Sequence, residues 1–118
     1  TSTVTDYGKF LQMILNKGKY NGNQIIGKKT IETITKGQNI NAWGSQISLA
    51  FGLLTDKDLY KGYGGSSGTL STGGYWNTSA FADPVENIIG IIYKQTYDIG
   101  NDPTSAAYRR LVFQSIIE

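Results

Sequence analysis

The amino-acid sequence predicts an α+β fold in which a three-stranded antiparallel sheet packs against two N-terminal helices and one C-terminal helix. Apolar residues recur at helical spacing near both ends of the chain, and apolar runs in its second half are separated by short turns. Short connections imply that neighbouring strands run antiparallel. The 118 residues, 39% of them hydrophobic and 17% charged, have the composition of a single globular domain.

The first helix is expected at residues 3–16, where apolar side chains follow the three- and four-residue spacing of one helix face. Thr3 and Asp6 resemble a capping box with a shorter acid. Lys17 and Gly18 then provide a basic last turn and a glycine at which the helix can end. The pattern therefore predicts both ends of this helix.

A second, shorter helix is expected at residues 28–36, after an Asn- and Gly-rich turn at residues 20–23. Ile31 and Ile34 would face the core, and Gly37 would end the helix. The β-branched residues of this segment favour a helix less than those of the first segment do.

Three apolar segments are expected to form the sheet: residues 47–55, 69–83 and 88–97. Gly73 and Gly74 interrupt the second segment, which indicates a bulge, a turn or the close approach of another group. Turn-forming residues separate the segments, so we expect them to pair as antiparallel neighbours.

The last helix is expected to begin at Asp102 and Pro103, because proline is favoured at the first helical position. Its apolar stripe should cover one face of the sheet. The Ile-Ile-Gly-Ile-Ile run at residues 88–92 is too apolar for a strand with one exposed face. Two interpretations therefore remain open: the first two helices cover the second face, or another part of the protein does.

The composition excludes several classes of site. The chain contains no cysteine and no histidine, so it can form no disulfide, no Cys- or His-ligated metal site and no Ser-His-Asp triad. We therefore expect no metal and no cofactor. The net charge of +2, without a basic stripe, predicts no nucleic-acid partner. No apolar run approaches the ~20 residues of a membrane span, so we expect no span in this chain.

Five motifs follow one another along the chain. They are T-V-T-D-Y-G-K-F-L-Q-M-I-L-N at residues 3–16, Q-I-I-G at 24–27, A-F-G-L and T-D-K-D within 50–58, G-S-S-G-T-L-S-T-G-G at 65–74, and the segment 75–84 that ends in D-P. In order and spacing they resemble motifs of the β-lactamase-like serine hydrolases. This superfamily contains class C β-lactamases, penicillin-binding DD-peptidases and related esterases. The resemblance covers nearly the whole chain and rests on the five motifs together.

The resemblance implies that residues 1–118 form a single C-terminal subdomain of a β-lactamase-like domain, with a helical part at 1–37 and the sheet and final helix at 45–118. The family's nucleophile motif S-x-x-K is absent, because no serine is followed by a lysine three residues later. A literal Y-x-N at 75–77 follows the strand motif instead of preceding it, which indicates coincidence. The resemblance therefore implies that an upstream part of the same protein carries the catalytic serine. The chain would be a fragment, a separately expressed subdomain or a natural truncation.

In the resembling family the corresponding strand carries the third catalytic motif, written K-T-G, H-T-G or W-G-G, and lines the active-site cleft. Two registers are possible here, Ser71-Thr72-Gly73 and Thr72-Gly73-Gly74, and the second fits the spacing of the flanking motifs without gaps. The second register implies that the backbone N–H of Tyr75 is an oxyanion-hole donor, which stabilises the charge that develops on the acyl oxygen. In the first register Gly74 would be the donor. The resemblance implies substrate contacts at Ser71, Thr72, Gly73 and Gly74, although neither register contains the family's cation or tryptophan.

The function implied by the resemblance is hydrolysis of a β-lactam, a peptidoglycan peptide or a small ester or amide through an acylated serine, with no turnover by this chain alone. The alternative is a non-catalytic module that recognises cell-wall material or a protein partner, and a structural dimer through the sheet edge is a third possibility. The hydroxyls of Ser71 and Thr72 either bind substrate or pair within the sheet. The resemblance also implies a periplasmic or extracellular location at the cell envelope.

Overall fold

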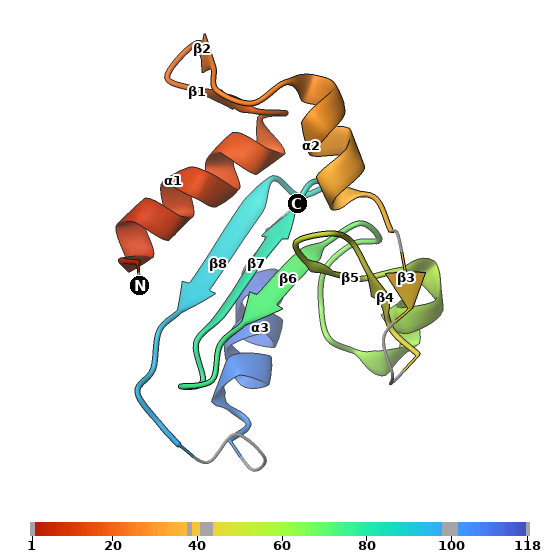
Figure 1. Cartoon of the computed structure of the whole chain (residues 1–118). Coiled ribbons are helices and arrows are strands. Elements are labelled where there is room, and N and C mark those ends of the chain that lie inside the picture. The colour runs from red at the N-terminus through yellow and green to blue at the C-terminus, as the bar shows by residue number, and fades with distance from the viewer. Residues whose placement is uncertain (1, 38, 41–43, 98–101, 118) are drawn as a thin grey trace.

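The computed structural model describes residues 2–37, 39–40, 44–97 and 102–117 of the chain. Helices alternate with short strands in the first half, and three longer strands precede the last helix (Figure 1). In chain order the elements are α1 (Val4–Leu15), β1 (Lys19–Tyr20), β2 (Asn23–Gln24), α2 (Lys28–Thr35), β3 (Asn39–Ile40), β4 (Gln46–Ile47), β5 (Gly52–Leu53), the 3-10 helix η1 (Asp56–Lys61), β6 (Leu70–Gly73), β7 (Ser79–Asp83), β8 (Ile88–Ile92) and α3 (Thr104–Gln114). The fold is thus the mixture of helices and antiparallel strands that the sequence predicts.

The larger sheet is built from six strands in the order β3-β4-β5-β6-β7-β8, and every neighbouring pair is antiparallel. The expected three-stranded sheet is therefore wrong. The segment 69–83 forms two strands, β6 and β7, and the segment 47–55 is divided between β4 and β5. β3, β4 and β5 have two residues each. Strands this short cannot show the apolar–polar alternation by which a strand is recognised in a sequence.

A separate two-stranded sheet pairs β1 with β2. Asn21 and Gly22 connect the two strands, and their φ angles of +48° and +80° lie in the left-handed region. Two consecutive residues of this kind form the tight turn that matches the twist of a hairpin. The predicted Asn- and Gly-rich turn is confirmed, and the structure adds the strands on either side.

α1 lies across one face of the sheet, against β7 and β8 (Figure 1). Thr3 caps the helix as predicted, because its hydroxyl accepts the N–H of Asp6 at 3.1 Å. Leu11 is 1% exposed and packs in the same core cluster as Ala80 of β7, and Ile31 of α2 joins that cluster. The second face is therefore covered, over this part of the sheet, by the N-terminal helices.

α3 lies on the opposite face of the sheet. Successive side chains of a strand point to opposite faces, so Phe81 points away from Ala80 and from α1. The centroid of the Phe81 ring lies 5.2 Å from that of Phe113 and 6.3 Å from that of Tyr108, both on α3. Gly90 of β8 is the strand partner of Phe81, and a Cβ atom at this position would collide with the ring. The glycine therefore makes room for the aromatic contact between β7 and α3.

α3 begins at Thr104, one residue later than the expected first helical position, and Pro103 is its N-cap. The Asp102 carboxylate accepts the N–H of Thr104 at 2.9 Å, which satisfies one of the free donors at the start of the helix. None of the helices in the described ranges is long and apolar enough to cross a membrane.

Candidate functional site

One edge of β6 is paired over only half of its length. β5 pairs with β6 at Leu70 and Ser71, whereas β7 pairs with all four residues of the strand. Thr72 and Gly73 therefore have a strand neighbour on one side alone among the described residues. This open edge lies at the end of the strand where the sequence resemblance locates its third motif.

The backbone of Gly73 points toward the open edge. The N–H of Gly74 donates to the carbonyl oxygen of Thr78 at 3.0 Å, so the backbone of Gly74 faces the β7 side of the hairpin. Along an antiparallel strand, the backbone groups of successive residues point to alternate edges. The N–H and C=O of Gly73 must then face away from β7. Gly73 also carries no side chain that would keep another molecule from these two groups.

A tight turn follows and directs the N–H of Tyr75 outward. The carbonyl of Gly74 accepts the N–H of Asn77 at 3.0 Å, and Asn77 adopts a φ of +66°, so Tyr75 and Trp76 form the centre of the turn. Described peptide bonds are all trans, so the N–H of Tyr75 points opposite to the carbonyl of Gly74 and away from the turn. Within the described ranges this N–H meets no hydrogen-bond acceptor, whereas the N–H of Gly74 is already engaged.

The tip of this turn is tied to the start of α3. The side-chain amide of Asn77 donates to Thr96 at 3.0 Å and to Asp102 at 3.2 Å. Lys94 forms an ion pair with Asp102 at 2.7 Å, and both side chains are mostly buried. Hydrogen bonds from Lys94 and Thr104 hold the pKa of the Asp102 carboxyl well below its usual range. The network keeps the turn in place relative to the helix.

The two hydroxyl residues of β6 point to opposite faces of the sheet. Thr72 faces α1 and shares a hydrogen bond with the Tyr7 hydroxyl, whose pKa is raised by burial. Ser71 faces α3, and its hydroxyl donates to the carbonyl of Gly52 at 3.4 Å, which is long for a hydrogen bond between oxygens. Each hydroxyl therefore has a partner within the protein.

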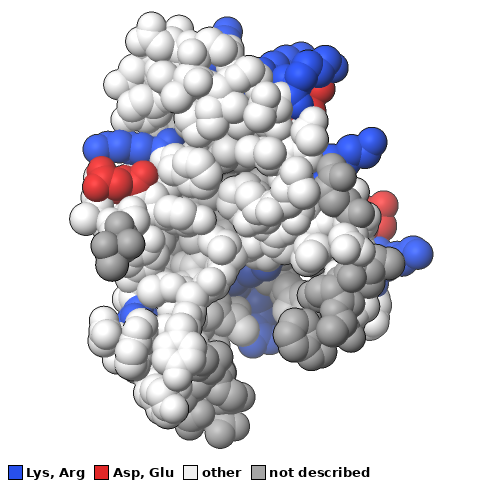
Figure 2. Space-filling model, viewed as in Figure 1, with Lys and Arg blue, Asp and Glu red and all other residues white. Residues whose placement is uncertain are grey.

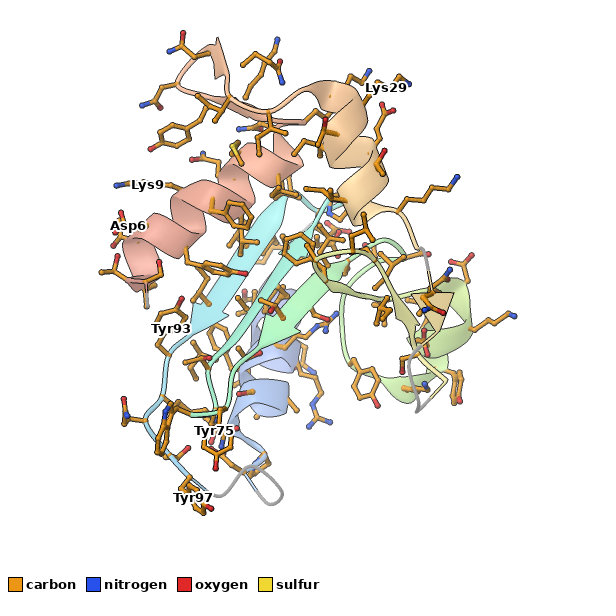
Figure 3. All side chains as sticks on the ribbon, viewed as in Figure 1. Asp6, Lys9, Lys29, Tyr75, Tyr93 and Tyr97 are labelled. Atoms are coloured by element: carbon orange, nitrogen blue, oxygen red, sulfur yellow. The ribbon has the colours of Figure 1, made fainter. Side chains whose placement is uncertain are left out.

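Two hollows flank the open edge. A hollow of about 190 Å³ on the α1 side is lined by Tyr7, Thr72, Gly73 and Tyr93, among others. Figure 3 shows Tyr93 just beyond the end of β8, on the side of α1. A wider hollow of about 620 Å³ lies on the α3 side, and its lining includes Ser71 and Arg109. Figure 2 shows this front face hollowed beside the β3–β5 strands, with Lys or Arg atoms deep inside.

Asp83 is fully buried at the end of β7, although its position before a proline predicts only a turn. Its carboxylate accepts four hydrogen bonds: from the N–H groups of Ser66, Val85 and Glu86 at 2.6, 2.8 and 3.1 Å, and from the Thr69 hydroxyl at 2.9 Å. Burial acts to raise the pKa of this carboxyl, but the hydrogen bonds outweigh it and hold the pKa below its usual range. Asp83 thus fixes the loop that leads into β6.

Sequence reasoning did not identify Arg109 or Tyr7. It considered Asp83 together with Glu86 and favoured a turn in which the carboxylate is solvated or caps a backbone N–H. Asp83 precedes Pro84, and an aspartate in such a position often accepts the N–H groups that follow it. The bonds from Val85 and Glu86 are of this kind, whereas the complete burial of Asp83 and its bonds to Ser66 and Thr69 are not evident from the sequence. Arg109 and Arg110 are adjacent on a helix, and the sequence does not distinguish which of them points to the sheet.

Neither a family model nor a curated protein sequence matches the chain. A solved structure does resemble it: the crystal structure of a novel penicillin-binding protein homologue from Caulobacter crescentus, with a TM-score of 0.69 and 18% sequence identity. The match covers 91% of this chain and 30% of that protein, so the chain spans less than a third of its length. At this identity the likeness shows the fold alone. The chain has the fold of one part of a penicillin-binding-protein homologue.

Proposed function

We propose that the chain forms one wall of the catalytic cleft of a β-lactamase-like serine hydrolase, and that it is inactive alone. The substrate would be a β-lactam, a peptidoglycan peptide or a small ester or amide. The observation that carries the proposal is the outward N–H of Tyr75, unengaged within the described structure, at the end of the half-paired β6. The penicillin-binding-protein-like fold supports it.

In this proposal the catalytic serine comes from an upstream part of the same protein. Its attack on the substrate carbonyl produces a tetrahedral oxyanion, and the N–H of Tyr75 donates a hydrogen bond to that oxygen. The N–H and C=O of Gly73 face the same edge and would bind the backbone of an extended substrate as an added strand does. Ser71, Thr72 and Gly74 would line the cleft beside it. The reaction would take place at the cell envelope.

The donor role can be tested without disturbing the turn. Tyr75 occupies the second position of the turn, where proline is favoured, so Tyr75→Pro removes the N–H and keeps the backbone shape. In the full-length protein, we expect this variant to lower kcat by about 10²- to 10³-fold on a chromogenic ester or cephalosporin. Tyr75→Ala is the matched control, because it removes the ring and retains the N–H, and its kcat should stay within a few-fold of the wild type.

Two results would contradict the proposal. Equal loss of activity in Tyr75→Pro and Tyr75→Ala would show that the ring, and not the N–H, matters. Hydrolysis by the purified 118-residue chain would show that the nucleophile lies within it.

A second candidate function, recognition of cell-wall material without chemistry, is favoured by the aromatic side chains at the hairpin tip. Tyr75, Trp76 and Tyr97 are 61%, 47% and 72% exposed, and their ring centroids lie 5.3 to 6.2 Å apart. Figure 3 shows Tyr75 and Tyr97 together at this end of the molecule. Exposed rings of this kind stack on sugars and peptides. Sedimentation of the chain with purified peptidoglycan, abolished by Trp76→Ala, would support recognition; no sedimentation would exclude it.

A further inference from the structure

The lysines are distributed unevenly along the chain. Residues 2–37 contain six lysines and only two acids, Asp6 and Glu32, whereas the rest of the chain has more acids than cations. These lysines are separated in the sequence, but α1, the β1–β2 hairpin and α2 lie together at one end of the molecule (Figure 1). Figure 2 shows Lys or Arg side chains gathered at this end. The small net charge of +2 therefore conceals one positively charged end.

Two of the lysines share a hollow. Lys17 and Lys19 line a hollow of about 370 Å³ between the end of α1 and the hairpin. The other residues that line it are uncharged: Leu15, Asn16, Asn21 and Gly22. Both lysines are exposed, and within the described ranges neither ammonium group forms an ion pair. Their two charges are therefore not neutralised locally.

Lys17 also connects this hollow with α2. Lys29 and Lys28 lie 2.9 and 4.0 Å from the carboxylate of Glu32. The hydrogen bond from Lys29 lowers the pKa of the Glu32 carboxyl. The charges of Lys28 and Lys17 lower this pKa further, so Lys17 lies close to the same carboxylate. We define the lysine surface as the four exposed residues Lys17, Lys19, Lys28 and Lys29. Exposed ion pairs are weak, so one carboxylate leaves this surface strongly positive.

Lys17 adopts a backbone conformation that is uncommon for lysine. Its φ of +55° lies in the left-handed region, where glycine and asparagine are favoured. The side-chain amide of Gln24 donates to the Lys17 carbonyl at 3.1 Å and helps to hold this turn. Asparagine would fit the same turn and lack the charge. Backbone geometry therefore does not explain a lysine at this position.

We propose that the lysine surface docks on a membrane that contains anionic phospholipids. Lysine carries a compact charge on a flexible stem, which suits the diffuse charge of many headgroups. A single ordered phosphate is matched better by the fork of an arginine, and residues 2–37 contain no arginine. The lysine surface therefore fits a charged bilayer better than one fixed phosphate group.

An exposed apolar side chain accompanies the lysines. The N–H of Ile25 donates to the carbonyl of Gly18 at 2.9 Å, and Gly18 separates Lys17 from Lys19. Ile25 is 60% exposed. An apolar side chain among lysines can enter the boundary between headgroups and acyl chains, as the apolar residues of interfacial segments do. A soluble polyanion would gain nothing from this side chain, so Ile25 favours a bilayer as the partner.

The docking surface lies far from the candidate catalytic edge. Figure 3 shows Lys29 and Tyr75 at opposite ends of the molecule. A chain docked through the lysine surface would turn the open edge of β6 away from the bilayer. The proposal goes beyond the proposed function and does not depend on it, because membrane binding needs neither the Tyr75 N–H nor a catalytic serine.

Vesicle flotation tests the docking directly. The 118-residue chain is mixed with vesicles of phosphatidylglycerol and phosphatidylcholine, or of phosphatidylcholine alone, and the bound fraction is measured at low and high salt. We expect binding to the anionic vesicles at low salt and its loss at about 0.5 M salt, where screening shortens the range of the charges. Vesicles of phosphatidylcholine alone should bind little of the chain.

Matched variants locate the surface. Lys17→Asn should weaken binding about fivefold, the effect of one lysine near an anionic surface. Its melting temperature should not fall, because asparagine tolerates the φ of +55°. Lys57→Asn is the matched control, since it is the same substitution at an exposed residue of η1, outside the lysine surface; its affinity should change less than twofold.

A third variant distinguishes a bilayer from a soluble polyanion. Ile25→Ser should weaken binding to the anionic vesicles several-fold and leave the salt dependence unchanged. Inorganic polyphosphate, titrated into the same chain, should bind the wild type and Ile25→Ser equally, and more weakly than the vesicles do.

Three results would overturn the proposal. Equal losses in Lys17→Asn and Lys57→Asn would show that binding follows the net charge and not this surface. Equal binding to vesicles with and without phosphatidylglycerol, or no binding to either, would exclude an anionic membrane as the partner. Tighter binding of polyphosphate than of the vesicles, with no effect of Ile25→Ser, would assign the surface to a soluble polyanion instead.

Discussion

The two helices that cover the sheet contribute very differently to it. α1 buries Leu11, Met13 and Ile14 in a continuous apolar core with β7, whereas every residue of α3 remains partly exposed. On the α3 side the sheet meets aromatic rings, Arg109 and two hollows. One face of the sheet therefore carries most of the buried apolar core, and the other carries hollows and a charged side chain.

β7 contributes side chains to both faces of the sheet, because successive side chains of a strand point to opposite faces. β7 directs Ala80 and Ala82, 2% and 0% exposed, toward α1. It directs Phe81 toward α3, and the fully buried Asp83 shares that side. The small alanines face the apolar core beneath α1, and the larger residues face α3. The difference between the two faces is thus encoded within five residues.

The largest expected effect comes from opening the α1 core. Leu11→Ala should lower the free energy of unfolding by about 2–5 kcal/mol, because a side chain that is 1% exposed leaves a cavity. Leu111→Ala on α3 is the matched control; this leucine is 64% exposed, so the change should stay within about 0.5 kcal/mol. Urea denaturation monitored by circular dichroism measures both. Similar losses in the two variants would remove the distinction between the faces.

A smaller effect is expected from the buried carboxylate on the α3 side. Asp83→Asn should cost about 1–3 kcal/mol at pH 7, because an amide cannot accept the same four hydrogen bonds. The pKa of Asp83 is lowered in the folded state, so its stabilising effect is present above the unfolded pKa of about 4 and is lost as the pH falls through the folded pKa.

The pH dependence provides the check. Below about pH 4 the wild type should lose stability more steeply than Asp83→Asn, measured by urea denaturation at a series of pH values. Asp56→Asn is the control, because Asp56 lies in η1 on the surface, and it should retain the wild-type slope. Parallel curves for the wild type and Asp83→Asn would show that this carboxyl does not contribute.

The three α-helices and β8 could be predicted from the sequence because their signals are local. The cap at Thr3, the glycine after Lys17 and the isoleucines of β8 act within a few residues of one another. The division of residues 69–83 into a hairpin could not be predicted with the same certainty. Gly73 and Gly74 indicated a break, but the choice between bulge and turn depends on the hydrogen bond from Gly74 to Thr78.

For the candidate site, the sequence led to backbone groups but not to the side chains that surround them. The position of Tyr75 relative to the other motifs led to a donor N–H, which remains a prediction. Arg109 lies 38 residues after Ser71 in the chain, and only the packing of α3 brings the two to one hollow. Convergence of this kind depends on tertiary contacts that no local pattern contains. The division of the chain into parts at 1–37 and 45–118 also remains a prediction.

The smallest expected effect is a gain in stability on the α1 side. Gly8 lies in the middle of α1, and a Cβ atom there would meet Ile91 Cδ1 at 3.6 Å, an ordinary contact. Gly8→Ala should therefore raise the free energy of unfolding by about 0.5–1 kcal/mol, because alanine favours the helix. Thermal denaturation measures the shift. A loss of stability would show that α1 lies too close to β8 for even one methyl group.

Gly90 has a consequence for how the sheet is assembled. β8 consists of four isoleucines around this glycine, so a shift of two residues along β7 would leave every isoleucine on its own face. Hydrophobic patterning alone cannot reject that error. Such a shift would bring Ile88 or Ile92 opposite Phe81, where only a residue without a side chain fits. Gly90 therefore sets the register of β8 against β7, because only the native pairing places a residue without a side chain opposite Phe81.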